Sequence, residues 1–170
     1  MATTDIFDRI KDDPHAWVEQ ADCLFISAKL SETALRAAMR KPATISNVRV
    51  EQLAFLDSFM MLTAFAFENL IKGLGVAKGM NWKTDFQEDG GHGIAAYVEK
   101  ATTVSTDEKN ILQRLQTFSI WAGRYPMPTK SGKYQADSLQ RTLSIPRDVE
   151  LIERLKARLK AEVRAAPTRS

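Results

Sequence analysis

The fold of this chain is decided by residues 55–71, which read FLDSFMMLTAFAFENLI. In a helix built from this stretch, apolar side chains face almost every direction, and a helix that is apolar all round lies buried inside a protein. Ser46 or Asn47 can cap the start of this helix, and glycines from Gly73 onward loosen its end near Ala77. The stretch therefore predicts a long central helix that other helices surround.

Four further helices are predicted around it, mainly from local signals. Asp13 is a capping side chain, and Pro14 after it suits the first turn of a helix. Ser105 and Glu108 have the spacing of a capping box. No alternating run indicates a strand, so the sequence predicts an all-α antiparallel bundle of about five helices. The four further ranges are about 13–41, 94–102, 105–123 and 146–165, with a short helical turn between 135 and 143.

Residues 1–170 fit a single domain, with a core from about 13 to 165 and flexible ends. Helical spacing marks the side chains that we expect to point inward from the outer helices. These are Trp17, Ala21, Leu24, Ala28, Leu35 and Met39, then Ile111, Leu112, Leu115, Phe118 and Trp121, and finally Val149, Ile152, Leu155, Leu159 and Val163.

Composition and charge place the chain among globular cytoplasmic proteins. The single cysteine, Cys23, cannot form an internal disulfide, which suits a reducing compartment. The longest apolar run, residues 59–67, is shorter than the about 20 residues that span a bilayer, and the N-terminus lacks an export signal. Of the net charge of +3, residues 141–170 carry +4 and the rest −1. A basic end attracts phosphates or acidic partners, but such a face is more often simply solvated.

Two charged side chains, Glu68 and Lys72, interrupt the apolar central helix. They lie one turn apart on one side, and burial of a charge costs several kcal/mol unless the charge is paired or faces a cavity. His92 follows two glycines at the predicted start of the next helix, where backbone N–H groups favour anions. The alternative for His92 is a capping or core histidine. We interpret the three residues as candidates for a ligand-binding site.

Trp121, Arg124 and Tyr125 close the fourth predicted helix. An arginine there could bind a phosphate in forked geometry, and the aromatic rings could stack on a base. We expect Glu68 to orient Arg124, so all three residues join the candidate site. The structural alternative is that Glu68 pairs with Arg124 or Lys72 only to hold the bundle in register.

Other chemistries find little support in the sequence. Two histidines and one cysteine, far apart, make no zinc pattern, and no P-loop, dinucleotide fingerprint or nucleophile elbow occurs. We therefore expect no metal, no cofactor and no catalytic residue. A hydrolase with His92 as base and Glu68 as its orienting group is a third, less favoured class.

Residues 66–74, AFENLIKGL, and then Gly91-His92-Gly93-Ile94 resemble the HEPN superfamily (higher eukaryotes and prokaryotes nucleotide-binding domains). Its members are small helical bundles in which a long helix with a Glu-x-x-x-Lys-like patch precedes a Gly-His-Asp-Leu-like turn into the next helix. Residues 120–126, IWAGRYP, look like a signature of uncharacterised bacterial relatives. The resemblance covers roughly residues 50–128 and implies a nucleotide-binding helical bundle.

The ribonuclease members of this superfamily carry an arginine, four to six arbitrary residues and a histidine late in the bundle. Here no histidine follows Arg124. A formal match at Arg9 and His15 lies at the wrong end, and Asp12-Asp13-Pro14 breaks any shared helix. The resemblance therefore implies the non-catalytic branch, which binds nucleotides or RNA, or which partners a nucleotidyltransferase or another toxin–antitoxin component.

The function expected from residues and resemblance together is binding of an anionic ligand, a nucleotide or RNA, without chemistry on it. Such a protein would be a toxin–antitoxin or defence component. The alternative is a non-enzymatic protein–protein interaction module, in which exposed helix faces and the basic C-terminal end recognise a partner protein. Helical bundles this apolar often dimerise, so we also expect a homodimer.

Overall fold

The computed structural model describes residues 10–42, 46–81, 83–87, 92–123 and 142–166. Within these ranges the chain forms five helices and no strand, and 79% of the described residues are helical. The predicted all-α bundle is confirmed. Its elements are α2 (Pro14–Met39), α3 (Ser46–Ala77), α4 (Ile94–Ala101), α5 (Thr106–Thr117) with its π-helical continuation η2 (Phe118–Ala122), and α7 (Arg147–Ala165).

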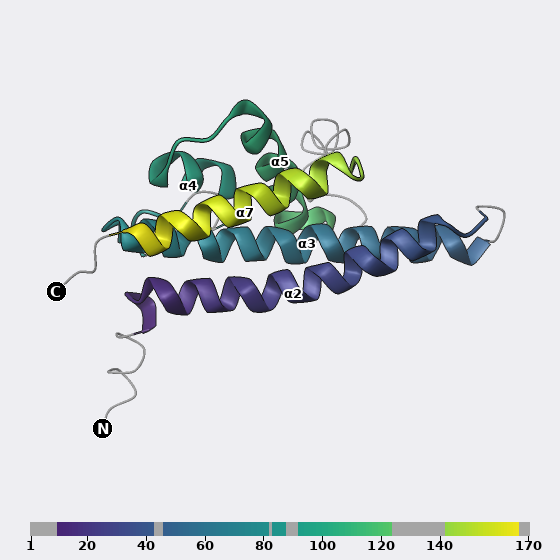
Figure 1. Ribbon diagram of the computed structural model, residues 1–170, viewed down its shortest axis with the longest axis horizontal. Coiled ribbons are helices and arrows are strands. Elements are labelled where there is room, and N and C mark those ends of the chain that lie inside the picture. The colour runs from purple at the N-terminus through teal and green to yellow at the C-terminus, as the bar shows by residue number, and fades with distance from the viewer. Residues whose placement is uncertain (1–9, 43–45, 82, 88–91, 124–141, 167–170) are drawn as a thin grey trace, which may run out of the picture.

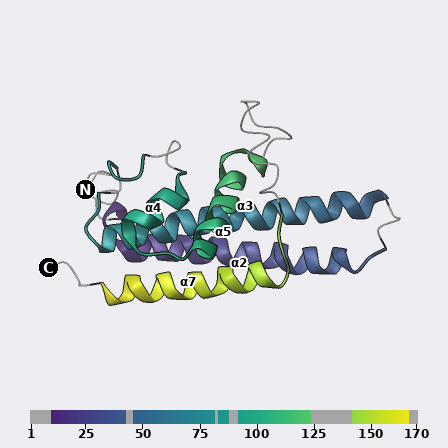
Figure 2. The same cartoon turned by 90° about the horizontal axis from the view of Figure 1, so that it is seen from above.

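α2 and α3 form a long antiparallel hairpin, and α3 is the helix that all the others contact (Figures 1 and 2). Gly73 lets the start of α2 approach α3 closely. A Cβ atom at Gly73 would lie 2.9 Å from the Cβ of Trp17 and 3.1 Å from the carbonyl oxygen of Pro14. We expected this glycine to loosen the end of the helix. Instead α3 continues through it to Ala77, and the glycine serves close packing.

The core surrounds the middle and the C-terminal half of α3, as predicted. Phe67 is fully buried, and its ring meets that of Phe25 edge-on, with the centroids 5.2 Å apart. All five residues predicted to point inward from α7 are buried, and so are Ile111, Leu112, Leu115 and Phe118. Trp17 and Leu24 are half-buried on α2.

Local signals set the helix ends where the sequence predicts them. The Asp13 carboxylate accepts a hydrogen bond from the backbone N–H of His15 at 2.9 Å, directly before α2. At α5 the Ser105 hydroxyl accepts from the backbone N–H of Glu108, and the Glu108 carboxylate accepts from that of Ser105. Both bonds of the predicted capping box are therefore present.

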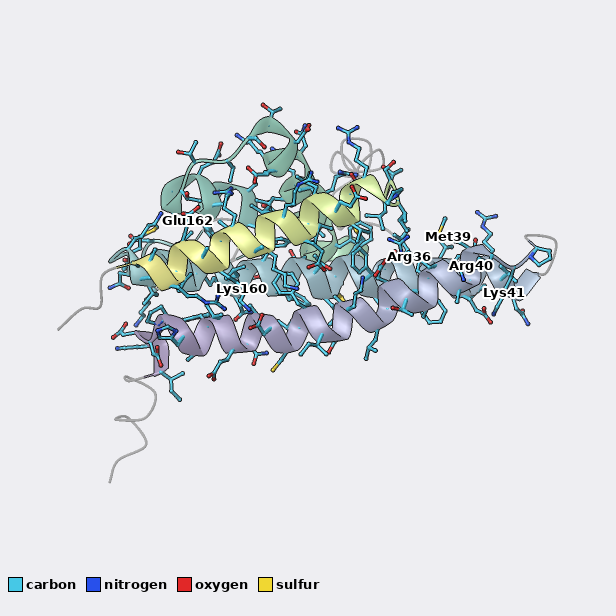
Figure 3. The ribbon with its side chains drawn as sticks, in the orientation of Figure 1. Arg36, Met39, Arg40, Lys41, Lys160 and Glu162 are labelled. Atoms are coloured by element: carbon cyan, nitrogen blue, oxygen red, sulfur yellow. The ribbon has the colours of Figure 1, made fainter. Side chains whose placement is uncertain are left out.

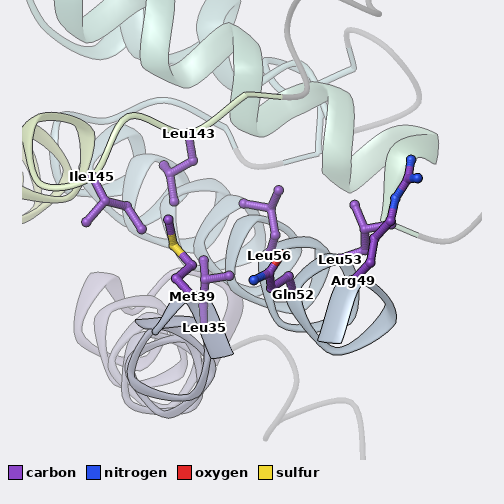
Figure 4. Close-up of a pocket in the computed structure, with 8 residues that line it drawn as sticks. All are labelled: Leu35, Met39, Arg49, Gln52, Leu53, Leu56, Leu143 and Ile145. Carbon is purple, nitrogen blue, oxygen red and sulfur yellow. The ribbon is translucent and has the colours of Figure 1, made fainter. Parts of the chain in front are cut away.

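The joined ends of α2 and α3 extend beyond the other described helices (Figure 1). Met39, predicted to point inward, is 57% exposed there, because α7 does not reach this end of the hairpin (Figure 3). An apolar groove of about 310 Å³ opens beside it (Figure 4). Its lining residues are Leu35, Met39, Arg49, Gln52, Leu53, Leu56, Leu143 and Ile145. Most of the turn predicted at 135–143 lies outside the described residues.

In the described part of the chain, one helix, Asn47–Ala77, is long and apolar enough to cross a membrane by length and composition. Half of its most apolar window is buried inside the bundle. Its packing against α2, α4, α5 and α7 accounts for this apolarity, because a helix surrounded by other helices needs apolar residues on several faces.

Candidate functional site

Glu68 and Lys72 form an ion pair on α3. The Lys72 Nζ donates to Glu68 Oε1 at 2.7 Å, and the side chains of Glu68 and Lys72 are only 12% and 15% exposed. An unpaired charge at this depth would be costly, and the pairing removes that cost. The interruption of the apolar helix is therefore a paired polar cluster, and Lys72 is one of the two partners that the sequence offers for Glu68.

His92 completes this cluster from the segment before α4. Its Nδ1 lies 2.8 Å from Glu68 Oε2, so each carboxylate oxygen of Glu68 holds one basic side chain. The imidazole is 37% exposed, and the N-cap of α4 is Gly93. His92 is thus neither a core histidine nor the helix cap. A bond between Nδ1–H and a carboxylate orients the ring and leaves Nε2 as its other hydrogen-bonding atom.

Aromatic rings border the Glu68–Lys72–His92 cluster. The Phe65 ring centroid lies 6.3 Å from that of His92, and the Lys72 Nζ lies 6.0 Å from the centroid of the buried Tyr97 ring. Lys72 is thus placed over an aromatic face, which attracts cations. The cluster therefore combines two basic groups and one carboxylate beside two aromatic rings.

The first amides of α4 do not provide the anion site that we expected beside His92. The backbone N–H of Ile94 donates to the carbonyl of His92 at 2.9 Å. The backbone N–H of Ala95 donates to Gln116 Oε1 at 3.1 Å. Because these two donors already have partners, attraction for an anion here comes from the side chains of Lys72 and His92.

The remaining predicted site residues cannot be placed beside this cluster. The backbone of Trp121 lies in η2, but its side chain is outside the described residues. Arg124 and Tyr125 lie outside them altogether. The structure therefore brings together Glu68, Lys72 and His92, and the pairing of Glu68 with Arg124 stays a prediction.

Three basic side chains of the C-terminal end are paired within the fold. Lys160 Nζ binds Asp22 of α2 at 2.6 Å, Lys156 binds Glu153 at 3.1 Å, and Arg158 bonds both Glu108 and Glu162. Charges that are already paired attract a distant phosphate less. This finding favours the solvated interpretation of the basic end over the nucleic-acid one for these three side chains.

Sequence reasoning missed a well-buried ion pair between two helices. The guanidinium of Arg114 on α5 donates two hydrogen bonds to the carboxylate of Asp148 on α7, at 2.7 and 3.0 Å. The backbone N–H of Ser144 also donates to this carboxylate. Burial alone would raise the pKa of Asp148, but these bonds outweigh it and hold the pKa below its usual range. The acidic residues in the first turn of α7 can be recognised in the sequence, but they do not indicate which basic residue pairs with Asp148.

Glu32, also missed, is buried on α2 at 1% exposure between Lys29 and Arg36, both of which bind it. Burial raises its pKa, and the two basic neighbours lower it to a net value below the usual range. Lysine and arginine at these helical spacings are a detectable signal. Both contacts of Glu32 lie within α2, so they pair its buried charge inside one helix.

Two other kinds of site find no support. In the described ranges no group of three or more histidine, cysteine, aspartate and glutamate side chains could hold a metal ion. The groove at the end of the hairpin is lined almost wholly by apolar side chains, and Gln52, one of its two polar members, donates to the carbonyl of Ala38. It lacks the converging polar groups that orient a small ligand.

No protein-family model, curated protein or solved structure matches this chain.

Proposed function

We propose that this protein is a HEPN-like helical bundle that binds an anionic ligand, a nucleotide or an RNA end, without performing chemistry on it. The observation that carries the proposal is the double contact of Glu68, which holds the basic groups of Lys72 and His92 side by side. Trp121, Arg124 and Tyr125 belong to the proposed site through the resemblance. The proposal includes a cytoplasmic location and a role in a toxin–antitoxin or defence pair.

The cluster suits an anion because its basic groups outnumber its carboxylate. Glu68 carries one negative charge and contacts both basic side chains. A phosphate with two or three acceptor oxygens can bridge the side chains of Lys72 and His92, and Glu68 acts as the group that positions both.

The test is a thermal-shift and titration screen with ribonucleoside mono-, di- and triphosphates and short RNA oligonucleotides. A ligand that binds only the folded protein should add about 2.7 kcal/mol of stability at a hundred times its dissociation constant. We expect Lys72→Met to weaken the best ligand at least tenfold, which corresponds to about 1.4 kcal/mol.

The matched control is Lys160→Met. Lys160 is also a mostly buried lysine in an ion pair, 19% exposed, but its partner is Asp22 of α2. It should lose comparable stability and keep ligand affinity. A flat response across the whole screen, or equal loss of affinity in both variants, would contradict the proposal and leave the cluster as structural pairing.

The second candidate function is a protein–protein interaction module. One specific observation favours it, namely large apolar side chains that α2 exposes along its outer face, such as Ile26 and Leu30. Exposed apolar stripes of this kind mark sites of protein association. The two functions are compatible, since the stripe and the Glu68 cluster lie on different helices.

A further inference from the structure

The face of α2 that points away from the core carries a continuous apolar stripe. Ile26 and Leu30 are 66% and 70% exposed. Cys23 and Ala37 are also exposed, and Ala34 is half-buried beside them. The five residues, Cys23, Ile26, Leu30, Ala34 and Ala37, follow one another at steps of three or four, so they form one line along the helix. We call them the α2 stripe.

No other helix in the described ranges covers the α2 stripe. α2 lies at one edge of the bundle, with α3 along its inner side (Figure 1). Its contacts with α7 are made by Asp22, which binds Lys160, and by Phe25, whose ring centroid lies 4.8 Å from Lys156 Nζ. At about 100° per residue, Phe25 lies about 140° around the helix from Leu30 and Asp22 about 80°, so the contact with α7 borders the α2 stripe on one side and leaves Leu30 pointing outward.

The charges around the α2 stripe are separated along the helix. Glu19 is exposed near the N-terminal end, whereas Arg40 and Lys41 are exposed at the C-terminal end (Figure 3). Lys41 binds Glu51 of its own chain, and both side chains remain more than 40% exposed. A helix that is acidic at one end and basic at the other is complementary to a second copy of itself in antiparallel orientation.

Side-chain sizes fit the same arrangement. In an antiparallel pair with its two-fold axis at Leu30, the large Ile26 of one copy faces the small Ala34 of the other. Cys23 then faces Ala37, and Glu19 lies towards the end of the partner helix that Arg40 and Lys41 follow. Apolar steps of three and four are those with which paired helices interlock. A parallel pair would set Glu19 against Glu19 and would therefore be disfavoured.

The area available indicates the strength of such a pair. A helix of 26 residues is about 39 Å long, and a strip about 10 Å wide along it projects about 400 Å² from each copy. Two such strips fall below the about 1,200 Å² of a standard stable interface. The association should therefore depend on protein concentration.

We propose that the α2 stripe is a homodimer interface, in which two copies of α2 pack antiparallel across a two-fold axis at Leu30. The proposal rests on the α2 stripe and its charges alone, so it stands or falls independently of the Glu68 cluster.

The first test measures molecular mass against concentration by light scattering or sedimentation. The full chain should move from its monomer mass of 19.1 kDa towards twice that mass as its concentration rises. Leu30→Glu should stay monomeric with an unchanged helical spectrum, because its side chain is exposed in the monomer. Ala157→Glu, on the exposed face of α7, is the matched control and should dimerise normally. A wild-type chain that is monomeric up to about 1 mM overturns the proposal.

The second test reports orientation by cross-linking and does not depend on how Leu30→Glu folds. Leu30→Cys in a Cys23→Ser background should form an intermolecular disulfide on mild oxidation, because disulfides require Cα atoms within about 7 Å. Ala37→Cys with the native Cys23 should do the same. Ala157→Cys in the Cys23→Ser background should not cross-link. Rapid cross-linking of the wild-type chain through Cys23 would show parallel pairing and would overturn the antiparallel arrangement.

Discussion

α2 and α7 are both long surface helices with well-buried inner faces, yet their outer faces differ completely. The exposed positions of α7 include Glu150, Glu153, Arg154 and Arg164, with alanine between them. Those of α2 include Ile26 and Leu30. Exposed apolar stripes on a helix are typical of sites of protein association, and this contrast with α7 is the basis of the interface proposed for α2.

The two helices also attach to the bundle differently. α7 is held by ion pairs with other elements, Arg114–Asp148 and Arg158–Glu108, as well as by its apolar face. The buried carboxylate of α2, that of Glu32, is paired within α2 itself. Asp22 of α2 pairs with Lys160 of α7, but α2 packs on α3 mainly through apolar contacts. Removing a charged group that pairs with α7 should therefore weaken the packing of α7 on the bundle. Removing an apolar side chain from the outer face of α2 should weaken only the association of two copies of the chain.

The largest effect is expected from Asp148→Ala. This change leaves Arg114, 21% exposed, without its carboxylate, and it removes the acceptor of the Ser144 amide. Loss of one partner of a buried pair costs about 3–5 kcal/mol. Urea denaturation should show this loss as a lower midpoint. The control is Glu153→Ala, which breaks an exposed pair with Lys156 and should change stability by less than about 0.5 kcal/mol.

The next effect compares a leucine on each helix. Leu155 on the inner face of α7 is fully buried, and Leu155→Ala should destabilise by about 2–5 kcal/mol through lost burial and a cavity. Leu30→Ala on the outer face of α2 should change monomer stability by less than about 0.5 kcal/mol. Denaturation at low protein concentration measures both. A large loss from Leu30→Ala in the monomer would mean that Leu30 is covered by its own chain.

These contrasts show which features could be predicted from the sequence. Helix ends follow from neighbours a few residues apart, so Asp13 and the Ser105–Glu108 capping box were correctly predicted. The same holds for the inner face of α7, where apolar and charged residues alternate with one clear period. α2 is apolar on two opposite faces, and periodicity alone does not say which face is inner. Met39 shares the inner face with the buried Leu35, one turn away, but it is exposed because the hairpin carries it beyond the reach of α7.

The candidate site divides in the same way. The Glu68–Lys72 pair lies within one helix, so its spacing makes it predictable. The contact of His92 with Glu68 spans 24 positions in sequence and depends on where α4 packs against α3. The resemblance placed the two motifs together, but no rule of local structure gives that contact. The pairing of Arg114 with Asp148 across 34 positions was missed for the same reason.

The smallest effect is expected from mild acidification, which should affect α7 at a higher pH than α2. Glu108, Asp148 and Glu162, which all belong to or bind α7, have pKa values below their usual range: burial raises each, but hydrogen bonds and nearby basic groups lower it further. A carboxyl whose pKa is lower in the folded state stabilises the fold at pH above its unfolded pKa, and this contribution is lost as the pH falls through the folded pKa. The unfolded values are 4.5 for glutamate and 3.8 for aspartate, so the loss should begin below about pH 4.5.

Because α7 depends on three such groups and α2 on Glu32 alone, backbone amides of α7 should lose hydrogen-exchange protection at a higher pH than those of α2. Glu162→Gln should reduce this pH dependence, whereas the exposed Glu150→Gln should not. Simultaneous loss of protection in both helices would show that the ion pairs of α7 do not govern its docking.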